Sequence, residues 1–443
     1  MNNISDSSSR PHIVVIGGGF AGLNFIKNID KSKYRVTLVD RNNFHSFPPL
    51  FYQIASGGID SASICFPFRR EMRKRAAKGV EYHMTEVREI DVANKKLHTK
   101  LATIPYDMLV IAAGTTNNFF GDPELIKKVY TIKSTPQAVR CRNAILDRLE
   151  RGCLAKDAEL RSMQFSFVVI GGGPTGVEIA GALGEMKRYI LPREYPEVNP
   201  EEVHITLLEG SDRLLRTMSQ EASAKSLEYL KRLGVDVRLN HLMKSYDDHV
   251  VTLGDGQTLT AGMVIWTAGV TGVTFKVTGT DFTLAPGNRF EVDEYNRVKG
   301  LQDVYALGDI SYMPTADYPR GLPQLAQPAI QQGKCLARNL NEGSFNTPFR
   351  YKDKGSMATV GRNLAVADLK KTHLSGFIAW LAWMFVHLIS LLGMRNKLAV
   401  LINWIWSYFT YGSSLRIIIR STRYPLRSRW KDDSDSTPSQ FPT

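Results

Sequence analysis

The 443-residue sequence predicts an α/β fold built from two similar parallel-sheet units and a C-terminal apolar helical region. Residues 12–22 (HIVVIGGGFAG) and 167–178 (FVVIGGGPTGVE) both indicate a β-branched strand, a glycine turn and a helix start. Further along, YDMLVIAAGT (106–115) corresponds to AGMVIWTAGV (261–270), as expected of two copies of one topology. Residues 369–431 contain ten Lys or Arg, no acidic residue and five of the six Trp, which sets this region apart.

The first glycine turn has the spacing of a dinucleotide-binding motif, with Gly17, Gly19 and Gly22 between a strand and a helix. Gly17 permits the tight turn, Gly19 lets the backbone approach a pyrophosphate, and Gly22 allows close helix–strand packing. The helix N-terminus offers unpaired N–H groups to phosphates. Asp40 ends the following strand, where a carboxylate accepts hydrogen bonds from ribose hydroxyls. These features predict a Rossmann-like domain.

The second copy has Gly171, Gly173 and Gly176, with Glu209 closing its second strand. Its glycine-to-acid spacing is longer, and residues 188–202 are expected to form a longer helix end and a loop. A carboxylate at Glu209 repels a ribose 2′-phosphate and therefore favours NAD over NADP. Since Arg213 lies nearby in the sequence, NADP is disfavoured but stays open.

Two such folds in one chain predict a flavin that stays bound and a nicotinamide that exchanges. The segment VYALGDI (304–310) supports the flavin, because an acid at Asp309, after an apolar strand, can hold ribityl or pyrophosphate-side oxygens.

The C-terminal region is expected to meet a membrane. Residues 376–393 carry no formal charge, and 18 residues reach the lower limit for a spanning helix. Residues 398–411 are expected to form a second, amphipathic helix rich in Trp. Trp and Tyr favour the headgroup level, and basic residues favour anionic lipid. A single span would put the Arg-rich tail outside, so a helix pair lying in one leaflet is favoured, while spanning stays open.

Several classes of protein and site are disfavoured. The four cysteines form no CxxC pair and no Cys/His cluster with zinc spacing, so we expect no metal site. The N-terminal MNNISDSSSR lacks an apolar segment, so no secretory signal is expected. Nucleic acid is a poor partner, because the basic residues are interleaved with apolar runs. Proton pumping is not expected either, since nothing indicates a multi-helix channel.

With these motifs the chain resembles the type II NADH:quinone oxidoreductases, the non-proton-pumping NADH dehydrogenases, from about residue 11 to residue 430. The resemblance also lies in PPLFYQIASG (48–57), WTAGV (266–270), AQPAIQQG (326–333) and the Trp-rich tail. It implies hydride transfer from NADH to FAD, then two electrons to a membrane quinone, either ubiquinone or menaquinone. It implies a peripheral, monotopic protein on the cytoplasmic face of the cell inner (plasma) membrane, in contact with anionic lipid. Whether the chain forms a homodimer stays open.

The resemblance also implies the site residues. FAD would be contacted by Gly17, Gly18, Gly19, Phe20, Ala21, Gly22, Asp40, Arg41, Val87, Gly114, Asp309, Ala326 and Gln327. NADH would be contacted by Gly171, Gly173, Gly176, Glu178 and Glu209.

Three residues are expected to take part in catalysis. Glu178, expected in the first turn of its helix, would either position NADH or relay protons, and both tasks stay open. Gln327 and Gln331, spaced i and i+4, share one helix face and would hydrogen-bond a quinone carbonyl.

The expected division is a FAD-binding domain (10–115 and 271–345, the latter with the quinone-site helix), an NADH-binding domain (116–270), a membrane-association region (346–431) and a disordered tail (432–443). The main alternative is a sulfide:quinone oxidoreductase or another disulfide-reductase-like flavoenzyme. Such an enzyme needs a redox cysteine near the flavin, and residues 41–64 and 160–270 contain none. A non-enzymatic NADH sensor would have no use for the two Gln amides.

Overall fold

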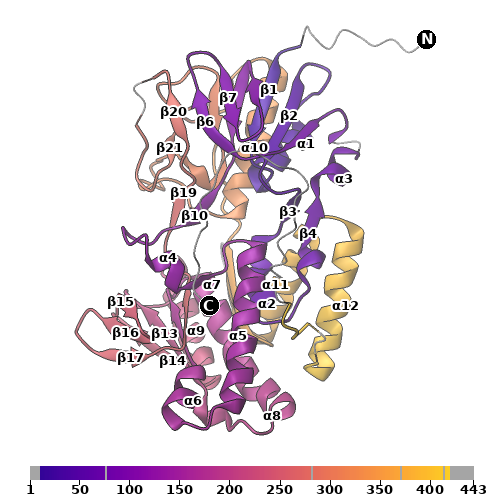
Figure 1. The fold of residues 1–443 in the computed structure, drawn as a ribbon. Coiled ribbons are helices and arrows are strands. Elements are labelled where there is room, and N and C mark those ends of the chain that lie inside the picture. Colours follow the sequence, from indigo (N-terminus) through magenta and orange to yellow (C-terminus); the bar gives the residue numbers. More distant parts are fainter. Residues whose placement is uncertain (1–9, 75–76, 281–282, 370–371, 413–414, 420–443) are drawn as a thin grey trace, which may run out of the picture.

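The computed structural model describes residues 10–74, 77–280, 283–369, 372–412 and 415–419, so the tail expected at 432–443 lies outside the described residues. Figure 1 shows two parallel sheets, one near the top of the molecule and one lower down. The first sheet, in the order β22-β9-β1-β2-β5, consists of β1 (His12–Ile16), β2 (Arg35–Asp40), β5 (Glu81–Met84), β9 (Met108–Ile111) and β22 (Val304–Ala306). The second, in the order β11-β18-β12-β13-β14, consists of β11 (Tyr130–Thr131), β12 (Ser166–Ile170), β13 (His204–Glu209), β14 (Asp236–Leu239) and β18 (Met263–Trp266).

The two sheets confirm the predicted α/β fold with two Rossmann-like units. Every residue of β1 and of β12 is buried, as expected of central parallel strands covered on both faces. Each unit adds an antiparallel meander, with hairpin turns near residues 94–96 and 255–256. The meander of the first unit consists of β6 (Val87–Asp91), β7 (Lys96–Thr99) and β8 (Thr103–Pro105), and β20 (Lys276–Thr278) pairs with β6 at its edge. The meander of the second unit consists of β15 (Met243–Asp247), β16 (Val250–Leu253) and β17 (Thr258–Thr260).

Helices cover both sheets. In the first unit α1 (Phe20–Asn28) packs against α10 (Ala326–Glu342), so closely that a Cβ on Gly333 would lie 2.5 Å from the carbonyl oxygen of Ala21. The second unit carries α4 (Leu125–Lys128), α5 (Thr135–Leu154), α6 (Ala158–Gln164), α7 (Pro174–Glu185) and α9 (Gln220–Arg232). A π-helical turn, Met186–Ile190, extends α7 into α8 (Leu191–Glu194), which confirms the longer helix end expected at 188–202.

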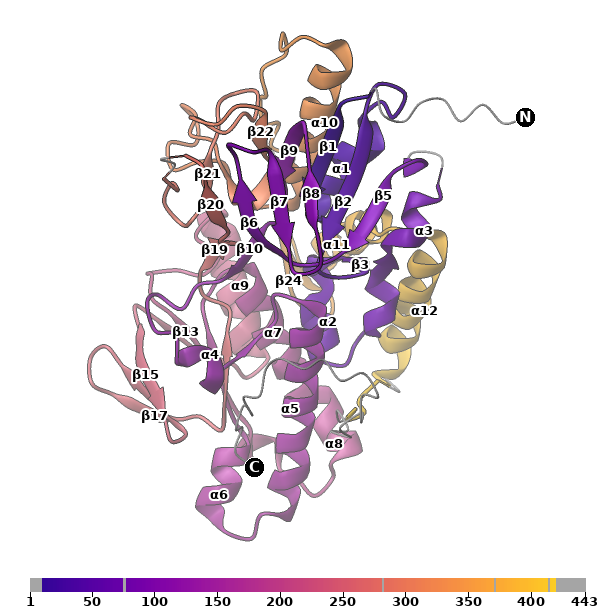
Figure 2. The same ribbon diagram turned by 45° about the horizontal axis from the view of Figure 1, so that its top comes forward.

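Short elements connect the two units. Strand β10 (Thr115–Asn117) pairs antiparallel with β19 (Val270–Gly272), so both crossings between the units lie side by side. Near the first glycine turn, β3 (Phe44–Ser46) pairs with β4 (Cys65–Pro67), flanked by α2 (Phe51–Ala55) and α3 (Phe68–Met72). Strands β21 (Phe290–Glu291) and β23 (Ser311–Tyr312) pair parallel with each other in a separate two-stranded sheet. Figure 2 shows α2 and α5 next to each other between the two units.

The C-terminal region begins with a sheet that the sequence analysis missed. Strands β24 (Ser356–Gly361), β25 (Leu364–Leu369) and β26 (Thr372–Ser375) form an antiparallel meander. The first turn places Asn363 at φ 63°, a conformation that asparagine tolerates, and this turn was the available signal. The two expected helices follow as α11 (Gly376–Ser390) and α12 (Met394–Thr410). Among the described residues, no helix has the length and apolar character needed to cross a membrane.

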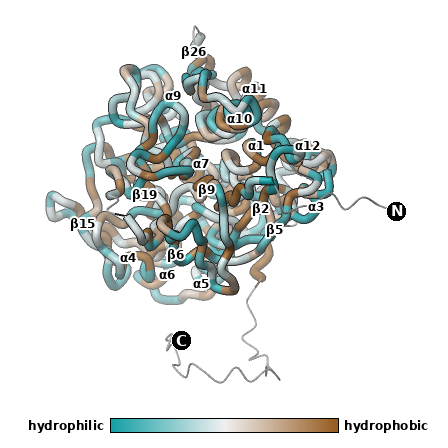
Figure 3. The backbone as a smooth tube through the Cα atoms, turned by 90° about the horizontal axis from the view of Figure 1, so that it is seen from above, coloured by the Kyte–Doolittle hydropathy of each residue, from teal (hydrophilic) through white to brown (hydrophobic). Residues whose placement is uncertain are grey.

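Helices α11 and α12 are part of the protein core on one side. Trp383, Val400 and Trp404 are buried and belong to the same apolar cluster as the second sheet. Their other sides carry exposed apolar residues, among them Phe385 and Phe409. Figure 3 shows the two helices near the periphery of the molecule. The region is therefore integrated with the fold rather than appended to it.

The contact between α7 and β24 joins the C-terminal sheet to the second unit. A Cβ on Gly181 would collide with the carbonyl group of Val360, so only glycine allows this approach. We expect Gly181→Ala to destabilise the protein by about 1–3 kcal/mol through overpacking, measured as a lower melting temperature. Gly254→Ala is the control, because a Cβ there would meet only one atom within 4 Å, at 3.8 Å. Equal melting temperatures for both variants would contradict the tight contact.

Candidate functional site

The expected FAD residues gather at one edge of the first sheet. Each of the five strands contributes the segment after its carboxyl end: the glycine turn after β1, Asp40 at the end of β2, Val87 after β5, Gly114 after β9 and Asp309 after β22. The carboxyl edge of a doubly wound sheet, where the strand order reverses, is where such folds bind ligands. Arg41, also expected there, follows β2 and is exposed.

Two half-buried carboxylates lie along this edge. Asp40 accepts hydrogen bonds from the backbone N–H of Gly18 and of Asn42, both at 2.8 Å, yet burial raises its pKa. Burial also raises the pKa of Asp309, opposed by the charge of Lys133 and a hydrogen bond from Thr115 Oγ1 at 3.3 Å. Because ionisation of Asp40 and Asp309 is costly here, hydrogen bonds from neutral hydroxyl groups of a ligand would suit both carboxyl groups.

Gln332 holds the turn that carries Asp309, and the sequence analysis missed it. Its Oε1 accepts from the backbone N–H of Gly308 at 2.7 Å, and its Nε2 donates to Ser311 Oγ at 3.2 Å. The side chain is almost fully buried, at 1% exposure. A run of two glutamines gives no signal for which amide is buried; only the docking of α10 decides it.

The geometry of the first edge fits FAD. A Cβ on Gly17 would lie 2.5 Å from the carbonyl oxygen of Ala112, and one on Gly22 would collide with the carbonyl of Gly17, so the turn needs both glycines. A Cβ on Gly19 or Gly114 would meet nothing within 4 Å, which leaves open space above the turn. No side chain caps the N-terminus of α1. Its first N–H groups therefore face that space without a side-chain acceptor, as a pyrophosphate requires.

The second edge has the same design. Helix α7 begins after Gly173 without a side-chain cap, and Gly171 and Gly176 pack as Gly17 and Gly22 do. Glu209 accepts from the backbone N–H of Gly172 at 2.5 Å and of Ser211 at 2.7 Å. The guanidinium of Arg213 donates to the backbone carbonyls of Met218 and Arg216, at 3.1 and 3.0 Å. These two bonds hold the Arg213 side chain to its own loop.

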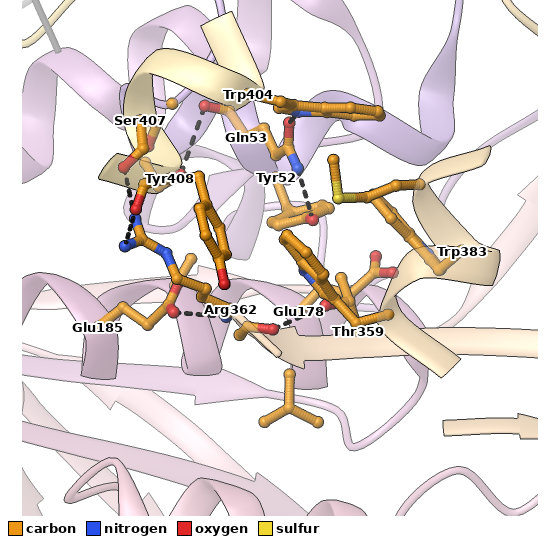
Figure 4. A pocket seen from close by; sticks show the side chains of 17 residues that line it. Tyr52, Gln53, Glu178, Glu185, Thr359, Arg362, Trp383, Trp404, Ser407 and Tyr408 are labelled. Atoms are coloured by element: carbon orange, nitrogen blue, oxygen red, sulfur yellow. Dashed lines mark hydrogen bonds between the residues drawn. The ribbon is translucent and has the colours of Figure 1, made fainter. Parts of the chain in front are cut away.

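A cavity of about 130 Å³ lies where α2, α7, β24 and the two C-terminal helices meet (Figure 4). Its polar lining includes Tyr52, Gln53, Glu178, Glu185 and Arg362. Its apolar lining includes Trp380, Trp383, Met384 and Trp404. The sequence analysis named only Glu178 among these residues, because the others come from segments far apart in the chain.

Glu178 lies deeper than expected. Helix α7 starts at Pro174, so Glu178 is in the second turn, and the first turn contains no acidic residue. Burial raises its pKa well above the usual range, with a hydrogen bond from the backbone of Thr359 opposing this. Burial raises the pKa of Glu185 as well, although the backbone N–H of Arg362 donates to it at 2.5 Å. A helix-dipole role therefore does not explain Glu178; the buried Glu178 and the half-buried Glu185, both on α7, line the cavity.

A row of aromatic rings connects the first glycine turn to this cavity. Phe20 packs edge-on against Phe47 at 5.7 Å, and Phe47 packs edge-on against His387 at 6.1 Å. His387 stacks on Trp383 at 4.0 Å, and Trp383 lines the cavity. Burial lowers the pKa of His387 to about 4, so the imidazole is neutral at pH 7.

The two glutamines expected to contact quinone differ in their surroundings. Gln331 Nε2 donates to the carbonyl of Lys352, and its Oε1 accepts from the N–H of Lys352, both at 3.0 Å. Both ends of the Gln331 amide are therefore bonded to the backbone of Lys352. The expectation that Gln327 and Gln331 together offer two free amides to a ligand does not fit this geometry. Gln327 and Ala326 are half-buried in the first turn of α10.

The chain is similar to known proteins over most of its length. The family model described as pyridine nucleotide-disulphide oxidoreductase matches residues 11–333, and that of the NDH2 C-terminal domain matches 354–411. Type II NADH:quinone oxidoreductases NdhA and Ndh of Mycobacterium tuberculosis are both 32% identical, over 89% of this chain and 86% and 87% of theirs. This protein belongs to the type II NADH:quinone oxidoreductases. The NDH2 structure from Plasmodium falciparum in complex with NADH has a TM-score of 0.85 at 24% identity, covering 93% of this chain and 100% of that one.

As a member of this family the protein is an FAD-dependent enzyme that oxidises NADH and reduces quinone, in agreement with the sequence analysis. The sulfide:quinone oxidoreductase of Aquifex aeolicus is a more distant structural neighbour, with a TM-score of 0.69 at 18% identity. All four cysteines are free, and burial raises the pKa of each thiol, to about 12 for Cys141 and about 11 for Cys153. Redox-active thiols need the opposite shift. Among the described residues, no three His, Cys, Asp or Glu side chains gather as metal ligands.

The carboxylate of Glu209 is expected to set the nucleotide preference of this type II oxidoreductase. We expect NADH to be the better substrate than NADPH, and Glu209→Arg to weaken the use of NADH while FAD stays bound, because the two sites lie on different sheets. Steady-state kinetics with both nucleotides and the flavin content of the variant measure this. Arg213→Ala is the control and should leave the preference unchanged, since Arg213 is bonded to its own loop. A wild-type preference for NADPH would contradict this role of Glu209.

Proposed function

We propose that electrons pass from NADH at the second sheet, through FAD at the first, to a quinone whose head group enters the cavity around Glu178. The observation that carries this proposal is the cavity itself, which brings the helix after the second glycine turn against the two apolar C-terminal helices. A lipid-borne substrate can reach such a cavity from the membrane side while the nucleotides bind from water.

The residues that would hold FAD are the glycine turn Gly17–Gly22, Asp40, Val87, Gly114 and Asp309. When bound there, FAD supplies the two-electron chemistry that links a hydride donor to a quinone acceptor. The N–H groups at the start of α1 would hold the pyrophosphate, and Asp309 would hold a ribityl hydroxyl. Arg41, exposed beside Asp40, would contact the adenosine end. NADH would lie likewise on Gly171, Gly173 and Gly176, with Glu209 on its ribose.

Helix α10 points its N-terminus at the same edge and would hold the redox end of the site. The side chain of Ala329 lies 3.1 Å from the Cβ position of Gly308, so this helix end abuts the turn of Asp309. Unpaired N–H groups at Ala326 and Gln327 would stabilise negative charge there. Gln327 does not line the cavity around Glu178, so we assign it an amide contact on the flavin side of the path to quinone. Gln331 would position α10 through Lys352 and act indirectly.

The proposed role of Glu178 is in proton supply. Because NADH carries one proton with its two electrons, reduction of a quinone to a quinol needs one further proton. Glu178, buried in the cavity and with its pKa raised by that burial, is a source for it.

We propose that the exposed faces of α11 and α12 attach the protein to the cytoplasmic face of the cell inner membrane, without spanning it. The exposed apolar residues are Phe377, Ile378, Leu381, Phe385, Val386, Ile389, Met394, Leu398, Ile402, Ile405, Trp406 and Phe409. Arg395 is exposed beside them and suits anionic headgroups. Arg416 is committed elsewhere, because it forms an ion pair with Glu194 of α8. Apolar burial therefore contributes more to attachment than these charges do.

The contact assigned to Gln327 is tested by Gln327→Leu. Loss of one neutral hydrogen bond is worth about 0.5–1.5 kcal/mol, so reoxidation of the reduced enzyme by quinone should slow about 2–10-fold. Reduction by NADH should be unchanged, and stopped-flow flavin absorbance separates the two steps. Gln331→Leu serves as the comparison. It should lower the melting temperature but leave the rate of reoxidation by quinone nearly unchanged. An effect of Gln327→Leu confined to the NADH step would move this residue off the path to quinone.

Attachment is tested by a double variant, Phe385→Ser with Phe409→Ser. Each buried Phe side chain is worth about 1.5–3 kcal/mol, so vesicle binding should weaken at least about 100-fold. Binding of the wild type should persist at high salt, since salt screens charges but does not weaken apolar burial. Phe120→Ser is the control, because Phe120 is as exposed (69%) but lies between the two units. Release of the wild type by salt alone would contradict the apolar mode.

A further inference from the structure

Three side chains of the cavity form a continuous hydrogen-bond chain. The indole Nε1–H of Trp404, on α12, donates to Oε1 of Gln53 at 2.8 Å. Nε2 of Gln53 donates in turn to the hydroxyl oxygen of Tyr52 at 2.8 Å. Figure 4 shows both bonds and the Tyr52 ring beside the cavity that Glu178 also lines.

The direction of this chain follows from donor chemistry. An indole N–H can only donate, so the atom of Gln53 that faces Trp404 must be its oxygen. The NH₂ group of the same amide then faces Tyr52, and an amide N–H also only donates. The hydroxyl oxygen of Tyr52 is therefore an acceptor toward Gln53, and its hydrogen points elsewhere, on the side away from that amide.

The cavity is the environment left for that hydrogen. Tyr52 is buried, at 7% exposure, and its ring lies edge-on to Trp383 at 6.3 Å. Burial raises the pKa of Tyr52 well above its usual value, and Glu178 and Glu185 line the same cavity as the phenol. The phenol oxygen has a second lone pair that can accept a proton from a neutral carboxylic acid.

The position of Trp404 is itself fixed. Arg362 donates through its guanidinium to the carbonyls of Ser407 and Tyr408 at the end of α12, at 2.6 and 2.8 Å. Its backbone N–H donates to Glu185 at the end of α7. Helix α12 is thereby held against α7, and the donor on Trp404 keeps Gln53 in one amide orientation.

We propose that Tyr52 is a proton-donating residue of the quinone half-reaction, and that Gln53 and Trp404 are positioning residues that turn its hydroxyl hydrogen into the cavity. The proposal rests on the assignment of quinone to this cavity. The overall reaction is NADH + H⁺ + quinone → NAD⁺ + quinol. Tyr52 passes its hydroxyl proton to a quinone oxygen and takes the proton of the Glu178 carboxylic acid, which solvent then restores. The two electrons come from NADH.

The test uses the full-length holoenzyme and a pre-reduced sample mixed with quinone. Tyr52→Phe removes the proton donor, and we expect the reoxidation rate to fall about 100-fold or more, the usual contribution of a positioned acid. Gln53→Leu and Trp404→Phe leave the donor but not its orientation, so about a 2–10-fold loss in limiting rate is expected, with unchanged apparent quinone affinity. Tyr246→Phe is the control, since this buried hydroxyl bonds the carbonyl of Ala261 in the distant meander.

A pH profile provides a readout that a structural role would not change. The titratable or charged groups that line the cavity with Glu178 are Tyr52 on α2, Glu185 on α7, Arg362 after β24 and Tyr408 on α12. With wild type, reoxidation should slow as pH rises through the raised pKa of Glu178, because the acid form is the proton source. Glu178→Gln and Tyr52→Phe should both abolish this dependence, whereas Trp404→Phe should keep it.

The outcomes separate this inference from the proposed function. Wild-type transfer to quinone together with an unimpaired Tyr52→Phe variant would overturn the relay and leave the function in place. A wild type that transfers no electrons to quinone would overturn the quinone assignment itself. Slower reduction by NADH in Tyr52→Phe would also overturn the relay, since it would place Tyr52 in the other half-reaction. Normal flavin content in each variant shows that the fold is kept.

Discussion

The contact between Gly181 of α7 and the carbonyl of Val360 is the constraint on which the cavity depends. It brings the helix that starts at the second glycine turn within backbone distance of the C-terminal sheet. As a result Glu178 and Glu185, seven residues apart on that helix, face the segment that leads into α11 and α12. Without this approach the nucleotide folds and the C-terminal helices would share no buried polar space.

Burial decides the chemistry of the groups in that space. The carboxyls of Glu178 and Glu185 and the phenol of Tyr52 all have raised pKa values because ionisation is costly away from water. His387 is neutral for the same reason. Burial therefore favours the protonated forms of these acids and of the phenol, beside the charged guanidinium of Arg362. Such groups can donate hydrogen bonds to a carbonyl without attracting a competing ion.

The two C-terminal helices have two sides with different surroundings. One side of each packs into the core through Trp383 and Trp404, and the other exposes large apolar residues such as Phe409. A helix that is apolar all round reads as membrane-spanning or as core, and the sequence alone does not separate these. In the structure the C-terminal sheet and α7 cover only one side of the helix pair, and no helix among the described residues is long and apolar enough to span a membrane.

The sequence by itself determined the two Rossmann-like folds, their glycine turns and Asp40, Glu209 and Asp309, because these depend on local patterns of strand, turn and helix. It also determined the family, through strings such as AQPAIQQG. Only the tertiary structure decided that Gln331 bonds Lys352, that Gln332 holds the turn of Asp309, and that Tyr52, Gln53, Glu185 and Trp404 share a cavity. The physical reason is distance along the chain: Gln53 and Trp404 are 351 residues apart, and no local pattern encodes their hydrogen bond.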